Sequence, residues 1–250
     1  MFVAVAGKGG TGKTTFVALV AKHLLKVGRG PVLAVDADAN ANLSQALGVQ
    51  VPFSIADIMR AVAEERESIP AGMTKDRYVA YRMHEALAEG KDLDLLEMGG
   101  PEGPGCYCYV NNLLRGYIKE LASNYQYILM DNEAGLEHLS RRTTQNVDVL
   151  FILSDATVKG IRSAKRIREL ADGLKLGVKR KYLVVNRASP EGIAVLTAEI
   201  EGTGLEYAGF IPPDPGVADY DLHAKPLLSL PEDSPAAVAV AGILKELEIV

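Results

Sequence analysis

The sequence lacks several features that would place it in a special class of protein. It has only two cysteines, which excludes a disulfide framework. No apolar run reaches the ~18 residues that crossing a bilayer requires, and no secretory pattern precedes the first apolar segment. The net charge of −5 gives no electrostatic footprint for nucleic acid. We therefore expect a cytoplasmic protein that partners neither a membrane nor a nucleic acid.

What the chain does have is an ordinary globular composition, with 48% hydrophobic and 24% charged residues. Short apolar segments alternate with helical ones, which is typical of an α/β fold with a parallel sheet covered on both faces. We expect a mostly parallel sheet of about seven or eight strands flanked by helices. Predicted strands are Phe2–Ala6, Val32–Val35, Leu93–Leu96, Tyr127–Met130, Val149–Leu153, Tyr182–Val185 and Tyr207–Ile211. Predicted helices lie near 15–25, 43–47, 110–122, 160–172, 190–200 and 235–247.

Residues 51–92 differ from the rest of the chain. They are polar and charged, and they are rich in helix formers, as in Ala61 to Glu67. We interpret this region as a helical insertion on a single domain that spans residues 1–250, rather than as a second domain.

The strongest motif lies between the first predicted strand and the first predicted helix. Residues Gly7 to Thr14 match the phosphate-loop (P-loop) template G-x-x-x-x-G-K-[ST]. Glycines let the backbone N–H groups curl inward, and the helix N-terminus adds partial positive charge. We expect Lys13 to reach the β- and γ-phosphates and the Thr14 hydroxyl to hold Mg²⁺. The predicted phosphate-binding residues are Gly9, Gly10, Thr11, Gly12, Lys13, Thr14 and Thr15.

The same glycines also satisfy the dinucleotide-binding fingerprint G-x-G-x-x-G, through Gly7, Gly9 and Gly12. That fingerprint requires an acidic residue about 20 residues later, and Asp36 comes close, so the acidic residue does not separate the two interpretations. The Lys13-Thr14 pair does separate them, because the dinucleotide fingerprint requires neither residue. The sequence therefore favours a nucleoside triphosphate.

Carboxylates follow two of the predicted strands. Asp36 and Asp38 come after Val32–Val35, and Asp131 comes after Tyr127–Met130. The carboxyl ends of parallel strands form the edge of the sheet where ligands bind. Beside bound Mg²⁺, a carboxylate can order metal-bound water or the attacking water. A capping aspartate at a strand-to-helix turn is the alternative role for Asp36.

The two cysteines, Cys106 and Cys108, are two residues apart in a segment rich in glycine and proline. In an extended segment, residues i and i+2 face the same side, so both thiolates could bind one metal ion. A closed tetrahedral site takes four ligands, which two copies related by a two-fold axis would supply. This pattern predicts a metal ion bound across a homodimer interface. The alternative is a pair of small buried apolar residues.

The form Lys8-Gly9-Gly10-Thr11-Gly12-Lys13-Thr14 resembles the deviant Walker A motif of the MinD/ParA/nitrogenase-reductase group of ATPases. The resemblance implies a homodimer in which Lys8 reaches the partner's nucleotide. It also implies that Asp38 orients the attacking water, with Asp36 near the metal. The resemblance further implies a Walker B-like contact to magnesium at Asp131 and a contact to the γ-phosphate at Gly135. It also implies contacts to adenine at Asn186 and Pro213.

Together with Gly105-Cys-Tyr-Cys108 and Ala134 to Arg141, this motif resembles the CooC family. These ATPases insert nickel into carbon monoxide dehydrogenase, and a close relative serves acetyl-CoA synthase. The resemblance implies ATP hydrolysis to ADP and phosphate by Lys8, Lys13 and Asp38, with Mg²⁺ as cofactor and one of those two enzymes as client.

Two other functions stay open at this point. One is a MinD/ParA-like positioning switch, although the last residues, Leu244 to Val250, hold one Lys and two Glu, which is wrong for anionic lipid. The other is an ATP-dependent iron–sulfur electron donor, because two cysteines from each chain would also supply a cluster's four ligands.

Overall fold

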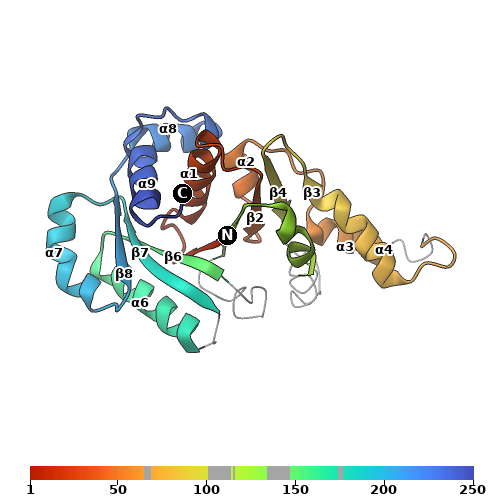
Figure 1. Ribbon diagram of the computed structural model, residues 1–250, viewed down its shortest axis with the longest axis horizontal. Coiled ribbons are helices and arrows are strands. Elements are labelled where there is room, and N and C mark those ends of the chain that lie inside the picture. Colours follow the sequence, from red (N-terminus) through yellow and green to blue (C-terminus); the bar gives the residue numbers. More distant parts are fainter. Residues whose placement is uncertain (65–68, 101–113, 115, 134–146, 174–176) are drawn as a thin grey trace.

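The structure is a computed structural model of residues 1–250, and it describes all of them except 65–68, 101–113, 115, 134–146 and 174–176. An eight-stranded sheet forms its centre, in the order β3-β4-β2-β5-β1-β6-β7-β8 (Figure 1). Neighbouring strands are parallel except for the pair β3 and β4. The predicted α/β class with a mostly parallel sheet is confirmed.

All seven predicted strands are present. Six of them are largely buried and so read as nearly continuous apolar segments, whereas the one at 206–211 lies at the edge of the sheet and is partly exposed. The seven strands are β1 (Phe2–Gly7), β2 (Val32–Ala37), β4 (Leu93–Glu97), β5 (Tyr127–Asn132), β6 (Val147–Asp155), β7 (Val178–Asn186) and β8 (Glu206–Ile211). The eighth, β3 (Leu87–Ala88), is a two-residue antiparallel edge strand that is too short to leave a periodic signal.

Five of the predicted helices are confirmed: α1 (Lys13–Lys26), α2 (Leu43–Leu47), α6 (Val158–Gly173), α7 (Pro190–Glu201) and α9 (Pro235–Glu246). The helix predicted at 110–122 lies partly outside the described residues, and its described part is helical over 116–121. The described residues also include two short 3₁₀ turns, η2 (Ala122–Asn124), directly after this helix, and η4 (Leu227–Ser229), before α9.

Helix α8 (Pro215–Leu222) was not predicted, because none of its residues is buried and it shows no apolar periodicity. Its beginning does carry a local signal. Asp214 is the N-cap, with its carboxylate accepting from the N–H groups of Gly216 and Val217, and Pro215 occupies the first turn.

Residues 51–92 are largely helical, as predicted, with α3 (Ile55–Glu64), α4 (Lys75–Met83) and the 3₁₀ turn η1 (His84–Ala86). In α3, Ile55, Ile58 and Val62 are buried in the same core cluster as β2 residues Leu33 and Val35. This helix therefore covers one face of the sheet, whereas α4 extends away from the sheet (Figure 1).

Two hydrophobic cores lie on opposite faces of the sheet, because alternate strand residues point to opposite sides. Ala4 and Ala6 of β1 belong to the core covered by α3, α6 and α7. Val3 and Val5 belong to the core covered by α1, α2 and α9. All the parallel strands end at one edge of this sandwich, so the residues that follow them meet there.

Replacing Phe151 by Ala tests the packing that holds α1 on the sheet. Its fully buried ring lies 5.0 Å from that of Phe16 and 5.8 Å from that of Tyr182, measured between ring centroids. We expect Phe151→Ala to lower the free energy of unfolding by about 3–5 kcal/mol, measured by urea denaturation. Val195→Ala on α7, at a side chain that is 84% exposed, should change it by less than about 0.5 kcal/mol. Equal effects of the two variants would contradict this packing.

Candidate functional site

The P-loop follows β1 and leads directly into α1. Gly10 and Gly12 have φ angles of 77° and 88°, a left-handed conformation that favours glycine. A Cβ atom at Gly12 would lie 2.3 Å from the Asn186 amide nitrogen, so the close approach also requires glycine there. Within the loop, the Thr11 hydroxyl donates to the Lys8 carbonyl over 2.8 Å. The shape of the loop therefore depends on glycine at these two positions and on a hydrogen bond within the loop.

Two residues at the end of β7 hold this loop from outside. The Asn186 amide donates to the Thr11 carbonyl at 2.8 Å, and the Arg187 guanidinium donates to the Gly10 carbonyl at 2.6 Å. Arg187 also donates its backbone N–H to the Asn186 side-chain oxygen at 2.9 Å. The role of Arg187 was missed, because no sequence pattern marks it. The purine contact predicted for Asn186 stays a prediction, since its amide here contacts the loop.

Two carboxylates lie beside the loop at the ends of neighbouring strands. Asp36 on β2 and Asp131 on β5 are partners in the sheet register, and both are almost completely buried. The Thr14 hydroxyl donates to Asp131 Oδ2 at 2.5 Å. Asp131 Oδ1 is also buried, and it has no hydrogen-bond partner among the described residues.

Burial raises the pKa of Asp131 to about 6, and the Thr14 hydrogen bond and the Lys13 charge oppose that shift. Burial raises the pKa of Asp36 to about 8, with Asp131 adding repulsion. A buried carboxylate with an unpartnered oxygen beside a hydroxyl suits a hard cation such as Mg²⁺. Among the described residues, no three His, Cys, Asp or Glu side chains could hold a metal ion by themselves. Thr14 and Asp131 therefore fit Mg²⁺ together with oxygens from a bound nucleotide.

Asp36 fixes the turn that follows β2. Its Oδ1 accepts from the backbone N–H of Asp38 at 2.9 Å, and its Oδ2 accepts from that of Leu43 at 2.8 Å. Both oxygens are thus used on the backbone, which is the capping role considered from the sequence. Asp38 in turn accepts from the backbone N–H and the side-chain amide of Asn40, both at 2.9 Å through Oδ1.

Two adjoining cavities open above these groups. The first, of about 660 Å³, is polar and is lined by residues of the P-loop, of α8 and of the segments that follow β2, β5 and α8, including Lys13, Thr14, Asp38, Glu133 and Lys225. The second, of about 440 Å³, is more apolar and is lined by Phe16, Leu19, Asn186, Pro213 and residues of α8. A polar cavity that adjoins an apolar one matches the two ends of a nucleoside triphosphate.

The structure thus brings together most of the predicted nucleotide site, with Gly9, Gly10, Gly12, Lys13, Thr14, Thr15 and Asp38 lining the polar cavity and Pro213 lining the apolar one. Lys8 is exposed and lines neither cavity. The predicted residues Cys106, Cys108 and Gly135 lie outside the described residues.

Comparison with known proteins agrees with this site. The family model of the CobQ/CobB/MinD/ParA nucleotide-binding domain matches residues 2–227. An uncharacterized ATP-binding protein of Methanocaldococcus jannaschii is 45% identical, over 99% of this chain and 98% of its own. The carbon monoxide dehydrogenase accessory protein CooC of Rhodospirillum rubrum is 30% identical, over 88% of this chain and 87% of its own. The structure of the cell division protein MinD of Aquifex aeolicus, at 25% identity, superimposes with a TM-score of 0.71 over 100% of this chain and 97% of that one.

The raised pKa of Asp131 predicts how nucleotide binding depends on pH. Binding Mg²⁺ requires an ionised carboxylate, so the affinity for Mg-ATP should rise as the pH increases through about 6 and then level off. Isothermal titration calorimetry between pH 5 and pH 8 measures it. The variant Asp131→Asn should bind more weakly above pH 6 and lose most of this dependence. A wild-type affinity that stays constant from pH 5 to pH 8 would contradict the assignment.

Proposed function

The chain belongs to the CobQ/CobB/MinD/ParA family of nucleotide-binding domains, and from that premise we propose that it is an ATP-dependent metallochaperone. Its cargo is nickel, and its client is carbon monoxide dehydrogenase or acetyl-CoA synthase. The observation that carries this proposal is the Cys106-Tyr-Cys108 pair in a chain that has a complete nucleotide cleft. Similarity to CooC over 88% of the chain supports it.

ATP would bind with its phosphates on the P-loop and its base in the apolar cavity. Lys13 lines the polar cavity and is only 8% exposed, so its charge acts on the phosphates with little competition from water. When bound, Mg²⁺ neutralises phosphate charge, with Thr14 and Asp131 holding it. Asp38 would orient the attacking water through Oδ2, because its Oδ1 already accepts from Asn40.

Lys8 supports a homodimer as the active form. Its backbone carbonyl is held by Thr11, while its side chain is exposed and makes no ion pair or hydrogen bond with a described residue. A lysine at the rim of the cleft that lies outside its own cavities is placed to reach the nucleotide of a partner. Two nucleotide sites would then close face to face.

The same closure would assemble the metal site. Two thiolates from each chain give the four ligands of a tetrahedral site, and thiolates bind nickel and zinc well. Residues just before the cysteines contact the turn that carries Asp38. The Met98 N–H donates to the Asp36 carbonyl at 2.9 Å, and a Cβ at Gly100 would lie 3.2 Å from the Ala39 carbonyl oxygen. Hydrolysis that moves this turn would therefore reach the segment leading to the cysteines, reopen the dimer and release the metal to the client.

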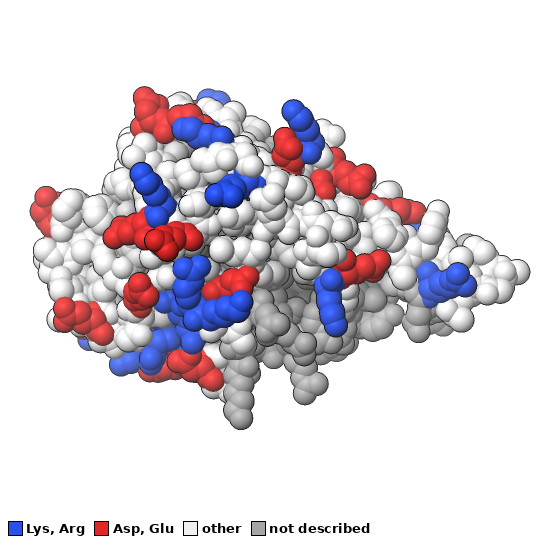
Figure 2. Space-filling model, in the orientation of Figure 1, with Lys and Arg blue, Asp and Glu red and all other residues white. Residues whose placement is uncertain are grey.

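A MinD/ParA-like switch is the second candidate, favoured by the similarity to MinD along the whole chain. Its membrane-binding form finds little support in the described residues. Ile249, after α9, is 1% exposed, and its carbonyl accepts from the Tyr127 hydroxyl at 2.8 Å. None of the described helices has the length and apolar character to span a bilayer. On the face in Figure 2, Lys and Arg side chains are interspersed with Asp and Glu.

Nickel titration tests the metal site. Equilibrium dialysis of the purified protein should give about one nickel per two chains, and the double variant Cys106→Ala/Cys108→Ala should lose it. The variant His223→Ala, which removes an exposed histidine, is the control for adventitious nickel binding. It should keep the wild-type ratio of nickel to protein. Unchanged stoichiometry in the double variant would rule out the thiolate site. An iron–sulfur absorption band in anaerobically purified protein would favour the electron-donor function instead.

Replacing Lys8 tests the composite nucleotide site. Lys8→Ala should lower the ATPase rate by about 100-fold or more, because a transition-state contact from the partner is lost. The affinity of the isolated chain for ATP should change little. Lys26→Ala, at an exposed lysine near the other end of α1, is the matched control. Steady-state kinetics and light scattering with ATP measure rate and dimerisation, and full activity of Lys8→Ala would exclude a contact between subunits.

A further inference from the structure

The two cavities of the nucleotide cleft meet at a boundary that five residues share. These are Gly12, Thr15, Arg187, Val217 and Asp221. The first two lie on the P-loop and at the start of α1, and Arg187 follows β7. Val217 and Asp221 lie on α8, four residues apart, so they occupy the same face of that helix. Helix α8 thus forms the wall opposite the P-loop, where the polar cavity gives way to the apolar one.

A nucleoside triphosphate has its sugar between its phosphates and its base. If the phosphates lie on the P-loop and the base lies in the apolar cavity, the ribose must lie at this boundary. The ribose hydroxyls are the hydrogen-bond donors of that middle part of the molecule. An acceptor at the boundary, facing the cleft, can therefore take a hydrogen bond from each of these hydroxyls.

Asp221 is the one carboxylate among the five boundary residues, and no hydrogen bond or ion pair joins its carboxylate to a described residue. Asp219, on the same helix, is different: it accepts from Lys225 at 2.9 Å and contacts His223 at 3.0 Å. Arg187 already donates to the Gly10 carbonyl. A carboxylate only accepts hydrogen bonds, so the groups of the ligand that it can pair with are the hydroxyls of the sugar.

We propose that Asp221 accepts hydrogen bonds from the ribose hydroxyls and so selects ribonucleotides over their deoxy analogues. The inference rests on the proposed binding of ATP in this cleft. It adds a specificity-determining residue that lies outside the P-loop and outside the turns that follow β2 and β5.

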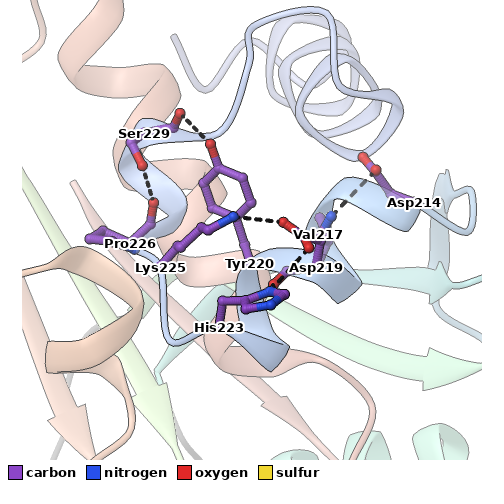
Figure 3. Close-up of polar contacts among 8 residues, drawn as sticks. All are labelled: Asp214, Val217, Asp219, Tyr220, His223, Lys225, Pro226 and Ser229. Atoms are coloured by element: carbon purple, nitrogen blue, oxygen red, sulfur yellow. Dashed lines mark hydrogen bonds and ion pairs between the residues drawn. The ribbon is translucent and has the colours of Figure 1, made fainter.

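The wall that carries Asp221 is fixed at both ends, as Figure 3 shows. At the beginning of α8, Asp214 accepts from the backbone N–H of Val217 at 3.4 Å. Toward its end, the Tyr220 hydroxyl donates to the Ser229 carbonyl at 3.0 Å, and Lys225 lies over the Tyr220 ring, 5.3 Å from its centroid. A carboxylate on a wall held in this way loses little freedom when it binds the sugar, which favours selectivity.

Binding of ATP and of 2′,3′-dideoxy-ATP, measured by isothermal titration calorimetry with Mg²⁺, tests the proposal. The wild-type chain should bind ATP about 10- to 100-fold more tightly, as expected for hydrogen bonds to a charged group. Asp221→Ala should weaken ATP binding by that factor and leave dideoxy-ATP binding unchanged, so the ratio of affinities falls to about one. The 2′-deoxy and 3′-deoxy analogues then identify which hydroxyl is bound.

Asp233→Ala is the matched control, because it removes an exposed carboxylate that lines neither cavity, and it should keep the wild-type ratio. Equal wild-type affinities for ATP and dideoxy-ATP would overturn the proposal. So would an Asp221→Ala variant that keeps the preference, or one that weakens both ligands equally. A wild-type chain that binds neither ligand would overturn the proposed function itself, and this inference with it.

Discussion

The carboxylates of Asp36 and Asp131 lie side by side at the ends of two neighbouring strands, both almost completely buried. Burial raises the pKa of both groups, and for Asp36 the neighbouring Asp131 adds to the shift, because removing a carboxylate from water costs free energy. Thr14 and the turn after β2 offset part of this cost through hydrogen bonds. Asp131 Oδ1 still has no hydrogen-bond partner among the residues that the structure describes. The two buried carboxyl groups thus have different surroundings: Asp36 is taken up by the turn after β2, and Asp131 keeps an oxygen that fits a cation.

The remaining parts of the cleft hold this pair in place from distant segments of the chain. The end of β7 holds the P-loop through Asn186 and Arg187, and α8 closes the opposite side. Because all the parallel strands end at one edge, residues more than 170 positions apart, such as Thr11 and Asn186, contact each other directly. The P-loop is thus one wall of a cleft whose other walls come from the second half of the chain.

Much of this could be predicted from the sequence, and the part that could not has identifiable causes. Strands buried on both faces leave continuous apolar segments, and the P-loop is a local motif, so both were found. Arg187 and Asp221 carry no such signal, because their positions depend on how β7 and α8 pack beside the P-loop. That residues 51–92 form an insertion on the domain stays a prediction, and the sequence did not reveal that α3 and α4 contribute buried residues to the same core as β2. For Asp36, residue spacing left a place near the metal and a capping role both open, and the structure shows the capping hydrogen bonds to both its oxygens.

The fold by itself does not choose among a metallochaperone, a positioning switch and an electron donor, since similar P-loop clefts can serve all three. The choice depends on what the nucleotide state moves. Coupling between two sites requires an element that both can bias. The turn from Asp36 to Leu43 meets this requirement on the nucleotide side. Its backbone donates two hydrogen bonds to the buried carboxylate of Asp36, beside Asp131, and it carries Asp38. Its other side contacts Met98 and Gly100, which precede the cysteines in the chain. These contacts place the start of that segment beside the nucleotide cleft, so the proposed cargo site would be coupled to the nucleotide through the chain that joins Gly100 to the cysteines.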